Sequence, residues 1–168
     1  MSERRCLVVF YSRTGNTRRV GVEVARQLGC TVDDLTDVKP RGGMLGFVKG
    51  GIDAARKRLT QVAGVGHDPG EFDLVVIGTP VWAGTMAPAV RTYLAERKDR
   101  LPEVAFFLTT RSTGVEKTFR HMEEACGKRP KATLDLRERD VRKGDPSEAI
   151  GAFVAALSAE PNEGRPAP

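Results

Sequence analysis

Residues 7–17, which read Leu-Val-Val-Phe-Tyr-Ser-Arg-Thr-Gly-Asn-Thr, decide the fold of this chain. The first five are apolar or aromatic and predict a strand that is buried on both faces. Beyond this stretch, Val20, Val24 and Leu28 recur at helical spacing, so we expect a helix with one apolar face. The segment 11–17 is therefore a loop that leads from a buried strand into the N-terminus of a helix.

This loop has the composition of a phosphate-binding site. The first N–H groups of a helix have no partner within it, and together with the helix dipole they attract an anion. Ser12, Thr14 and Thr17 add hydroxyl donors. Gly15 lets the backbone approach a ligand closely, and Asn16 tolerates unusual backbone angles. The alternative interpretation is an ordinary strand-to-helix turn that is capped by Ser and Thr.

The sequence Ser12-Arg13-Thr14-Gly15-Asn16-Thr17 also resembles the phosphate loop of the flavodoxin family. The resemblance implies that the cofactor is FMN and that these six residues hold its 5′-phosphate. It covers the chain from Arg5 to Leu157 and is closest to short-chain flavodoxin-like proteins. It also implies the fold, an α/β three-layer α/β/α sandwich around a five-stranded parallel sheet of strand order 2-1-3-4-5.

A second loop follows the apolar run 74–78 and carries the only tryptophan of the chain. A planar cofactor would gain dispersion energy from this aromatic ring, and the proline and glycines would fix a tight loop beside it. The stretch resembles the second flavin-binding loop of flavodoxins, which implies ring contacts from Thr79, Pro80, Val81, Trp82, Ala83, Gly84 and Thr85. In that family a backbone carbonyl of this loop meets flavin N5, and Ala83 and Gly84 are both candidates. From the residues alone, the alternative is a core tryptophan beside a helix that begins near Pro88.

A third loop follows the apolar run 104–108. The resemblance implies that it borders the pyrimidine edge of the flavin, through Thr109, Thr110, Arg111, Ser112 and Gly114. The match is looser here, because relatives commonly have a more glycine-rich or cysteine-glycine sequence. A guanidinium at this edge would favour the anionic hydroquinone and make the semiquinone/hydroquinone potential less negative. The alternative is that Arg111 points to solvent.

Strand and helix patterns alternate along the whole chain, which favours right-handed crossovers and a parallel sheet. The predicted strands are Leu7–Tyr11, Thr31–Leu35, Leu74–Gly78, Val104–Leu108 and Ala132–Leu136. The predicted helices are Thr17–Leu28, Phe47–Leu59, Ala87–Arg97, Glu116–Ala125 and Ser147–Ala159. In such a sheet the loops after strands one, three and four converge, so the three loops described above should meet.

Length and composition favour one domain. A chain of 168 residues with 40% hydrophobic residues can bury one good core but not two. We expect a flavodoxin-like domain over residues 1–159 and a disordered tail over residues 160–168, which are rich in Pro, Glu and Gly. Three cysteines without C-x-x-C spacing suggest neither a disulfide framework nor a zinc site, so we expect buried or incidental thiols. With only His67 and His121, neither a metal centre nor a Ser-His-Asp system is expected.

The net charge of +5 is unusual beside the acidic carriers of the flavodoxin family. Six basic residues cluster on one stretch opposed only by Asp53: Lys39, Arg41, Lys49, Arg56, Lys57 and Arg58. This stretch would steer an acidic partner, an anionic membrane surface or nucleic acid, or it is simply a solvated helix face. The glycine-rich segment 39–51 is either a lid beside the flavin or a hydrophobic anchor to the core.

Charge without interleaved aromatic residues argues against nucleic-acid binding. No apolar run is long enough for a membrane span, and the start of the chain leaves no room for a signal peptide, so we expect a cytoplasmic protein.

The leading functional hypothesis is an FMN-binding, flavodoxin-like protein that transfers electrons between redox protein partners. Because the flavin would supply the redox chemistry, no catalytic acid, base or nucleophile is expected. The second hypothesis is an NAD(P)H-dependent quinone or FMN reductase of the same superfamily, with NAD(P)H or a quinone as partner. The third is a non-redox interaction module that has lost its flavin. The sequence does not specify the oligomeric state, the flavin potentials or the redox partner.

Overall fold

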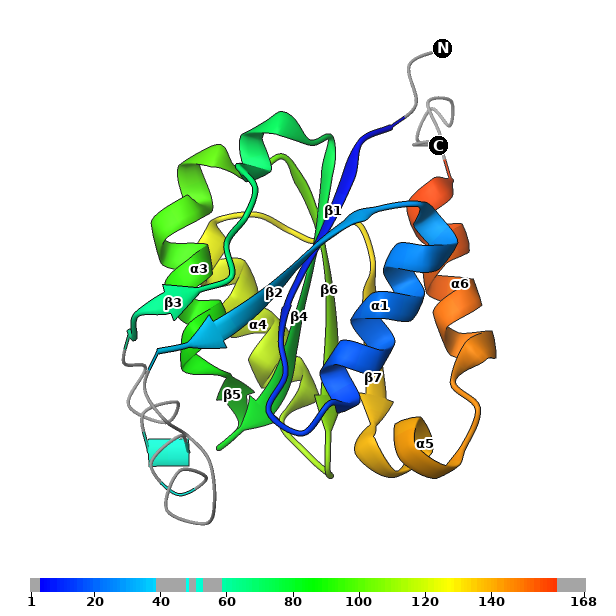
Figure 1. Cartoon of the computed structure of the whole chain (residues 1–168). Coiled ribbons are helices and arrows are strands. Elements are labelled where there is room, and N and C mark those ends of the chain that lie inside the picture. The colour runs from blue at the N-terminus through cyan, green and yellow to red at the C-terminus, as the bar shows by residue number, and fades with distance from the viewer. Residues whose placement is uncertain (1–3, 39–47, 49–50, 53–58, 160–168) are drawn as a thin grey trace, which may run out of the picture.

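The computed structural model describes residues 4–38, 48, 51–52 and 59–159. These residues form a sheet of seven strands with helices on both faces (Figure 1). Its five long strands are parallel to one another in the order β2-β1-β4-β6-β7, so the predicted order 2-1-3-4-5 is confirmed. Their bounds are β1 Cys6–Tyr11, β2 Thr31–Asp37, β4 Leu74–Trp82, β6 Glu103–Thr110 and β7 Thr133–Arg137.

Two short antiparallel strands complete the sheet. β3 (Val62–Ala63) pairs with the end of β2, and β5 (Thr85–Met86) pairs with the end of β4. A strand of two residues has no periodicity that a sequence pattern could reveal, which is why neither was predicted. The pairing of β4 with β5 matters for function, because it folds the second predicted loop into a hairpin.

The helices form the two outer layers of the predicted sandwich. On one face of the sheet lie α1 (Asn16–Leu28) and α6 (Ser147–Ser158), and on the other lie α3 (Pro88–Arg97) and α4 (Val115–Cys126) (Figure 1). The predicted helices in these places are confirmed to within two residues. One helix was missed: α5 (Glu138–Lys143) is a single charged turn and a half without a clear apolar face. Short 3₁₀ turns occupy Pro69–Glu71 and Lys98–Arg100.

Strand β1 shows how one sequence serves two cores. Leu7, Val9 and Tyr11 pack in the core beneath α3 and α4, whereas Val8 and Phe10 pack in the core beneath α1 and α6. All of them are buried, because β1 lies in the middle of a sheet that is covered on both faces. The helix α1 packs so closely on this strand that a Cβ added at Gly21 would overlap the ring of Phe10.

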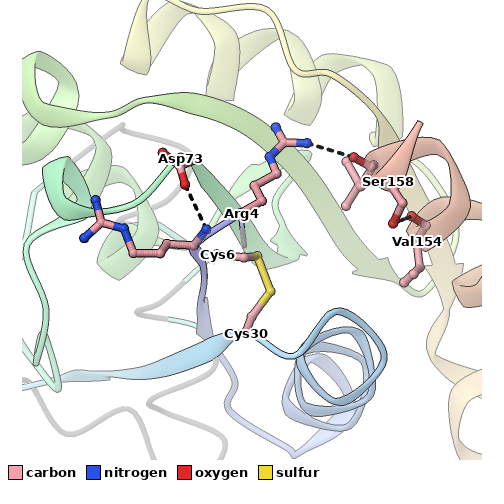
Figure 2. The surroundings of a disulfide bond; sticks show 8 residues. Arg4, Cys6, Cys30, Asp73, Val154 and Ser158 are labelled. Atoms are coloured by element: carbon pink, nitrogen blue, oxygen red, sulfur yellow. Dashed lines mark hydrogen bonds between the residues drawn. A yellow bond between two sulfur atoms is a disulfide. The ribbon is translucent and has the colours of Figure 1, made fainter. Parts of the chain in front are cut away.

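The cysteine prediction was wrong in one respect. Cys6, the first residue of β1, forms a disulfide with Cys30, which precedes β2 (Figure 2). The bond joins the N-terminal ends of two neighbouring parallel strands, beside the hydrogen bond that the Asp73 carboxylate accepts from the Arg5 N–H. Sequence spacing gave no sign of this pair, because 24 residues separate the cysteines and only the β1–α1–β2 crossover brings them together. Cys126 is a buried free thiol, as predicted.

Several predictions fall outside the described residues. They are the tail 160–168, the six basic residues between Lys39 and Arg58, and all but four residues of the predicted helix Phe47–Leu59. Within the described ranges, none of the helices is long and apolar enough to cross a membrane.

Candidate functional site

A cavity of about 260 Å³ opens at the C-terminal edge of the sheet, where β1, β4 and β6 end. Its walls come from the three loops that follow these strands, so the predicted convergence is observed. In parallel sheets this edge, at the point where strand order reverses, is where ligands bind. The reversal here falls between β1 and β4, because the chain runs outward from β1 to β2 and then returns to β4.

The first loop leaves the start of α1 without a side-chain cap. Gly15 is the N-cap residue, with φ of 94°, and among the described residues no side-chain hydrogen bond caps the helix. The first turn also contains no acidic residue. Ser12 instead accepts a hydrogen bond from the Gly15 N–H at 3.1 Å, which closes the loop over itself. The start of α1 is therefore uncapped, and Thr17 of its first turn lines the cavity, as an anion site requires.

The second loop is a tight hairpin. Trp82 pairs with Thr85, and the two residues between them, Ala83 and Gly84, have φ angles of 49° and 72°. Positive φ at both central residues is typical of the two-residue turn that matches strand twist. Glycine adopts this conformation freely, but an alanine there is strained by about 1–2 kcal/mol. Ala83 is the only residue besides glycine with positive φ in the described part of the chain, and it lines the cavity.

Trp82 lies between the cavity and the core. Its ring meets the ring of Tyr11 edge to face, with centroids 5.4 Å apart and planes at 89°. Only 9% of the tryptophan is exposed, and that part lines the cavity. Both earlier interpretations of this residue therefore hold at once, because it packs in the core under α3 and α4 and also faces the site.

Thr79 supports the second loop from within. It is fully buried; its hydroxyl donates to the Pro80 carbonyl at 2.9 Å and accepts from the Ala87 N–H at 3.0 Å. The bond from Ala87 ties the end of β4 to the start of α3, whereas the bond to Pro80 lies within β4. The Thr79 side chain thereby holds the two ends of the hairpin together, and its hydroxyl both donates and accepts a hydrogen bond within the protein.

The third loop packs directly on the second. Gly114 is the N-cap of α4 with φ of 92°, and a Cβ added to it would lie 2.9 Å from Cα of Gly84 and 3.3 Å from Cγ1 of Val81. The Thr110 hydroxyl accepts from the Ser112 N–H and donates to the Thr113 carbonyl, each at 3.3 Å, so the turn is braced locally. Only glycine fits where the two loops touch.

Arg111 extends from the third loop across the cavity rim to α5. Its Nε donates to Glu138 at 3.2 Å, and 67% of the arginine side chain is exposed against 16% of the glutamate side chain. The sequence left open whether Arg111 borders the site or points to solvent. The structure shows both, because Arg111 lines the cavity and is also open to solvent. A carboxylate this close offsets much of the positive charge that the arginine brings to the site.

A buried hydrogen bond links the first and third loops. The hydroxyls of Thr17 on α1 and Thr109 on β6 are 2.8 Å apart, and each residue is 1% exposed. In the first loop, the Asn16 side-chain amide donates to the Thr14 hydroxyl at 3.3 Å. The first loop is thus linked to the third by the Thr17–Thr109 hydrogen bond. The third loop in turn packs against the second where Gly114 lies beside Gly84.

The comparisons with known proteins agree with this geometry. No protein-family profile matches the chain, and no curated protein matches it. Among solved structures, a flavoprotein from Lactobacillus acidophilus NCFM in complex with FMN aligns with a TM-score of 0.69 at 20% identity, over 83% of this chain and 97% of its own. Two-electron reduced Megasphaera elsdenii flavodoxin aligns with a TM-score of 0.58 at 14% identity, over 91% and 99%. An NADH:FMN oxidoreductase in its apo form aligns with a TM-score of 0.52 at 16% identity, over 94% and 92%.

This chain has the flavodoxin-like fold. Against that fold, eleven of the residues predicted for the site line the cavity: Arg13, Thr14, Thr17, Pro80, Val81, Trp82, Ala83, Gly84, Thr110, Arg111 and Ser112. The other seven lie in the same loops but are not among the described residues that line it: Ser12, Gly15, Asn16, Thr79, Thr85, Thr109 and Gly114. For Thr79, Thr85 and Thr109 the reason is burial, because their hydroxyls face neighbouring elements.

Sequence reasoning missed two residues of this site, Thr113 and Glu138, which line the cavity. Gly51 also lines it, at the end of the segment 39–51, for which a lid was one of the two interpretations. Thr113 sits inside a loop that was identified, whereas Glu138 comes from the unpredicted helix α5. It also missed His121, which faces Thr85 from α4 and is buried. Among the described residues, no cluster of His, Cys, Asp or Glu could hold a metal ion.

Proposed function

We propose that this chain binds FMN and transfers electrons between redox protein partners. The observation that carries the proposal is the meeting of three loops around one cavity, with the uncapped start of α1 on one side and Trp82 on the other. A ligand that combines a phosphate with a flat aromatic ring satisfies both sides at once. Each side taken alone would fit many ligands, but the two together fit a flavin mononucleotide.

The residues of the first loop fit the phosphate. A phosphate monoester carries nearly two negative charges and several strong acceptor oxygens, and the start of α1 offers N–H donors with no competing carboxylate in the first turn. The Ser12 and Thr14 hydroxyls and the Arg13 guanidinium supply further donors in the same loop. Gly15 is required for the backbone to turn here, because its φ of 94° disfavours any residue with a side chain.

The residues of the other two loops fit the ring. Pro80, Val81 and Trp82 give the cavity an apolar wall, on which an aromatic ring is stabilised by dispersion. The exposed turn at Ala83 and Gly84 brings backbone groups to the same wall. When bound, the flavin supplies the redox chemistry. The chain contributes the wall, the backbone polar groups and the cations Arg13 and Arg111, whose charge favours electron-rich forms of the ring.

The partners of this carrier should be acidic. The chain carries a net charge of +5, and two arginines lie at the cavity, against one glutamate, Glu138. Electrostatic steering would therefore speed association with a negatively charged docking face and weaken as ionic strength rises. The expected location is the cytoplasm. The Cys6–Cys30 bond bears on this expectation, because disulfides persist mainly in oxidising compartments, so the redox state of this bond in cells tests it.

Steady-state and single-turnover kinetics separate the carrier from the NAD(P)H-dependent reductase. The FMN-loaded protein is mixed anaerobically with NADH or NADPH, and flavin bleaching is followed by stopped-flow absorbance. A carrier is reduced slowly by either nucleotide and rapidly by a flavoprotein reductase. Rapid bleaching by a nucleotide alone, followed by turnover with a quinone, would contradict the proposal and assign a reductase instead.

A further inference from the structure

A buried polar trio lies directly behind the hairpin that lines the cavity. Thr85, on β5, is 2% exposed; its hydroxyl oxygen is 2.8 Å from Nη2 of Arg91 on α3 and 2.7 Å from Nδ1 of His121 on α4. Arg91 and His121 are each 8% exposed. Three elements, β5, α3 and α4, therefore meet at one hydroxyl group, and none of the three residues is among those that line the cavity.

All three side chains bond through the one hydroxyl group of Thr85. A guanidinium can only donate, so the Thr85 oxygen accepts from Arg91. Between the Thr85 hydroxyl and Nδ1 of His121, the tautomer of the histidine decides which group donates.

Burial of the Arg91 guanidinium lowers the free energy of unfolding, so the residue needs a role other than stabilising the fold. Desolvation by burial lowers the pKa of Arg91, and the negative charge of Glu124 opposes this shift. Its Nε has no hydrogen-bond partner among the described residues. A buried cation with an unsatisfied nitrogen is destabilising by itself. An apolar residue at this position of α3 would be more favourable for folding alone.

The strained hairpin is what the trio supports. Ala83 keeps a positive φ of 49° without glycine's freedom, and such a residue persists only where its surroundings hold it in place. Thr85 closes the turn by pairing with Trp82. Its side chain is anchored to α3 and α4, so the backbone of the turn cannot relax without breaking two buried hydrogen bonds.

We propose that Thr85, Arg91 and His121 are positioning residues that hold the Ala83–Gly84 turn and Trp82 in the geometry that receives the flavin ring. The inference rests on the proposed function where it refers to the flavin. The clamp on the hairpin, by which we mean the hydrogen bonds that join Thr85 to Arg91 and His121, exists without the ligand. In this proposal the three buried side chains fix the position of the residues that contact the ring, and the first loop alone contacts the phosphate.

Binding of two ligands tests this division. Apo-protein is titrated with riboflavin, which lacks the phosphate, and with FMN, for the wild type and for Thr85→Val, Thr85→Ser and Arg91→Met. We expect Thr85→Val and Arg91→Met to weaken both ligands by roughly five- to tenfold, the scale of one buried hydrogen bond, so the ratio of the two dissociation constants stays unchanged. Thr85→Ser keeps the hydroxyl and should restore wild-type binding. The double variant should be no weaker than either single variant, because both break one network.

The matched control is Thr92→Val on α3. The Thr92 hydroxyl is equally buried and accepts a hydrogen bond from the Thr60 N–H at 2.8 Å, away from the cavity. It should lower stability without changing either dissociation constant. The proposal is overturned if Thr85→Val binds riboflavin as the wild type does, or if it weakens FMN alone.

Amide hydrogen exchange keeps the test independent of the proposed function. In the apo-protein, Thr85→Val should accelerate exchange in the Val81–Met86 hairpin at least tenfold relative to Thr92→Val. If the wild type binds neither ligand, the proposed function fails, and this measurement still decides the clamp. Unchanged hairpin exchange in Thr85→Val would refute the clamp whether or not a flavin binds.

Discussion

Reduction of the Cys6–Cys30 disulfide should destabilise the protein substantially. The bond closes a loop with a sequence separation of 24 residues, and the chain-entropy relation for such a loop gives about 3.5 kcal/mol at 25 °C. For a chain of this length, roughly 2–4 °C of melting temperature corresponds to each kcal/mol. We therefore expect the melting temperature to fall by about 7–14 °C when the bond is reduced.

The assay compares urea unfolding with and without a thiol reductant. Wild-type protein should lose about 3.5 kcal/mol of unfolding free energy on reduction, and Cys6→Ala/Cys30→Ala should not respond to the reductant. A thiol titration in denaturant provides the covalent check: of the three cysteines in the chain, one should react before reduction and all three afterwards. Three reactive thiols before reduction, or a stability change below about 1 kcal/mol, would refute the reasoning.

Three further predictions concern packing and charge. Gly21→Ala should destabilise the protein by about 1–3 kcal/mol in urea, because its Cβ would overlap Phe10, whereas Gly151→Ala on α6, with open space around it, should stabilise it by up to about 1 kcal/mol. Gly114→Ala should weaken FMN and riboflavin alike in titrations, because its Cβ would push the second and third loops apart. Redox titration should show a less negative semiquinone/hydroquinone potential in Glu138→Gln, which releases the charge of Arg111, and a more negative one in Arg111→Ala; equal potentials in all three proteins would exclude a role for this arginine.

The sequence predicted the sheet well because its central strands are continuous apolar runs. Leu7–Tyr11 and Leu74–Gly78 are buried on both faces, and such runs between helical patterns have few alternatives. The strand order, however, came from the resemblance to flavodoxins and not from the pattern. The ends of the strands were underestimated: β4 continues to Trp82, past a proline that the pattern treats as a boundary.

The parts that were missed depend on contacts between distant residues. The Cys6–Cys30 bond exists only because two strands are neighbours in the sheet. Glu138 reaches the cavity because it directly follows β7, whose last residue pairs with the end of β6, and no local pattern marks the helix that begins there. His121 looked like an isolated histidine, and only the packing of α4 against β5 brings it to Thr85.

The preference for FMN over riboflavin tests the central claim most directly. Protein purified without added flavin is stripped of any bound chromophore and titrated with both ligands by fluorescence quenching. The uncapped start of α1 and the hydroxyls of the first loop predict that FMN binds at least 100-fold more tightly, since a charge-assisted hydrogen bond contributes about 1.5–3 kcal/mol and the phosphate would accept at least two. Equal dissociation constants, or no binding of either ligand, would contradict the account.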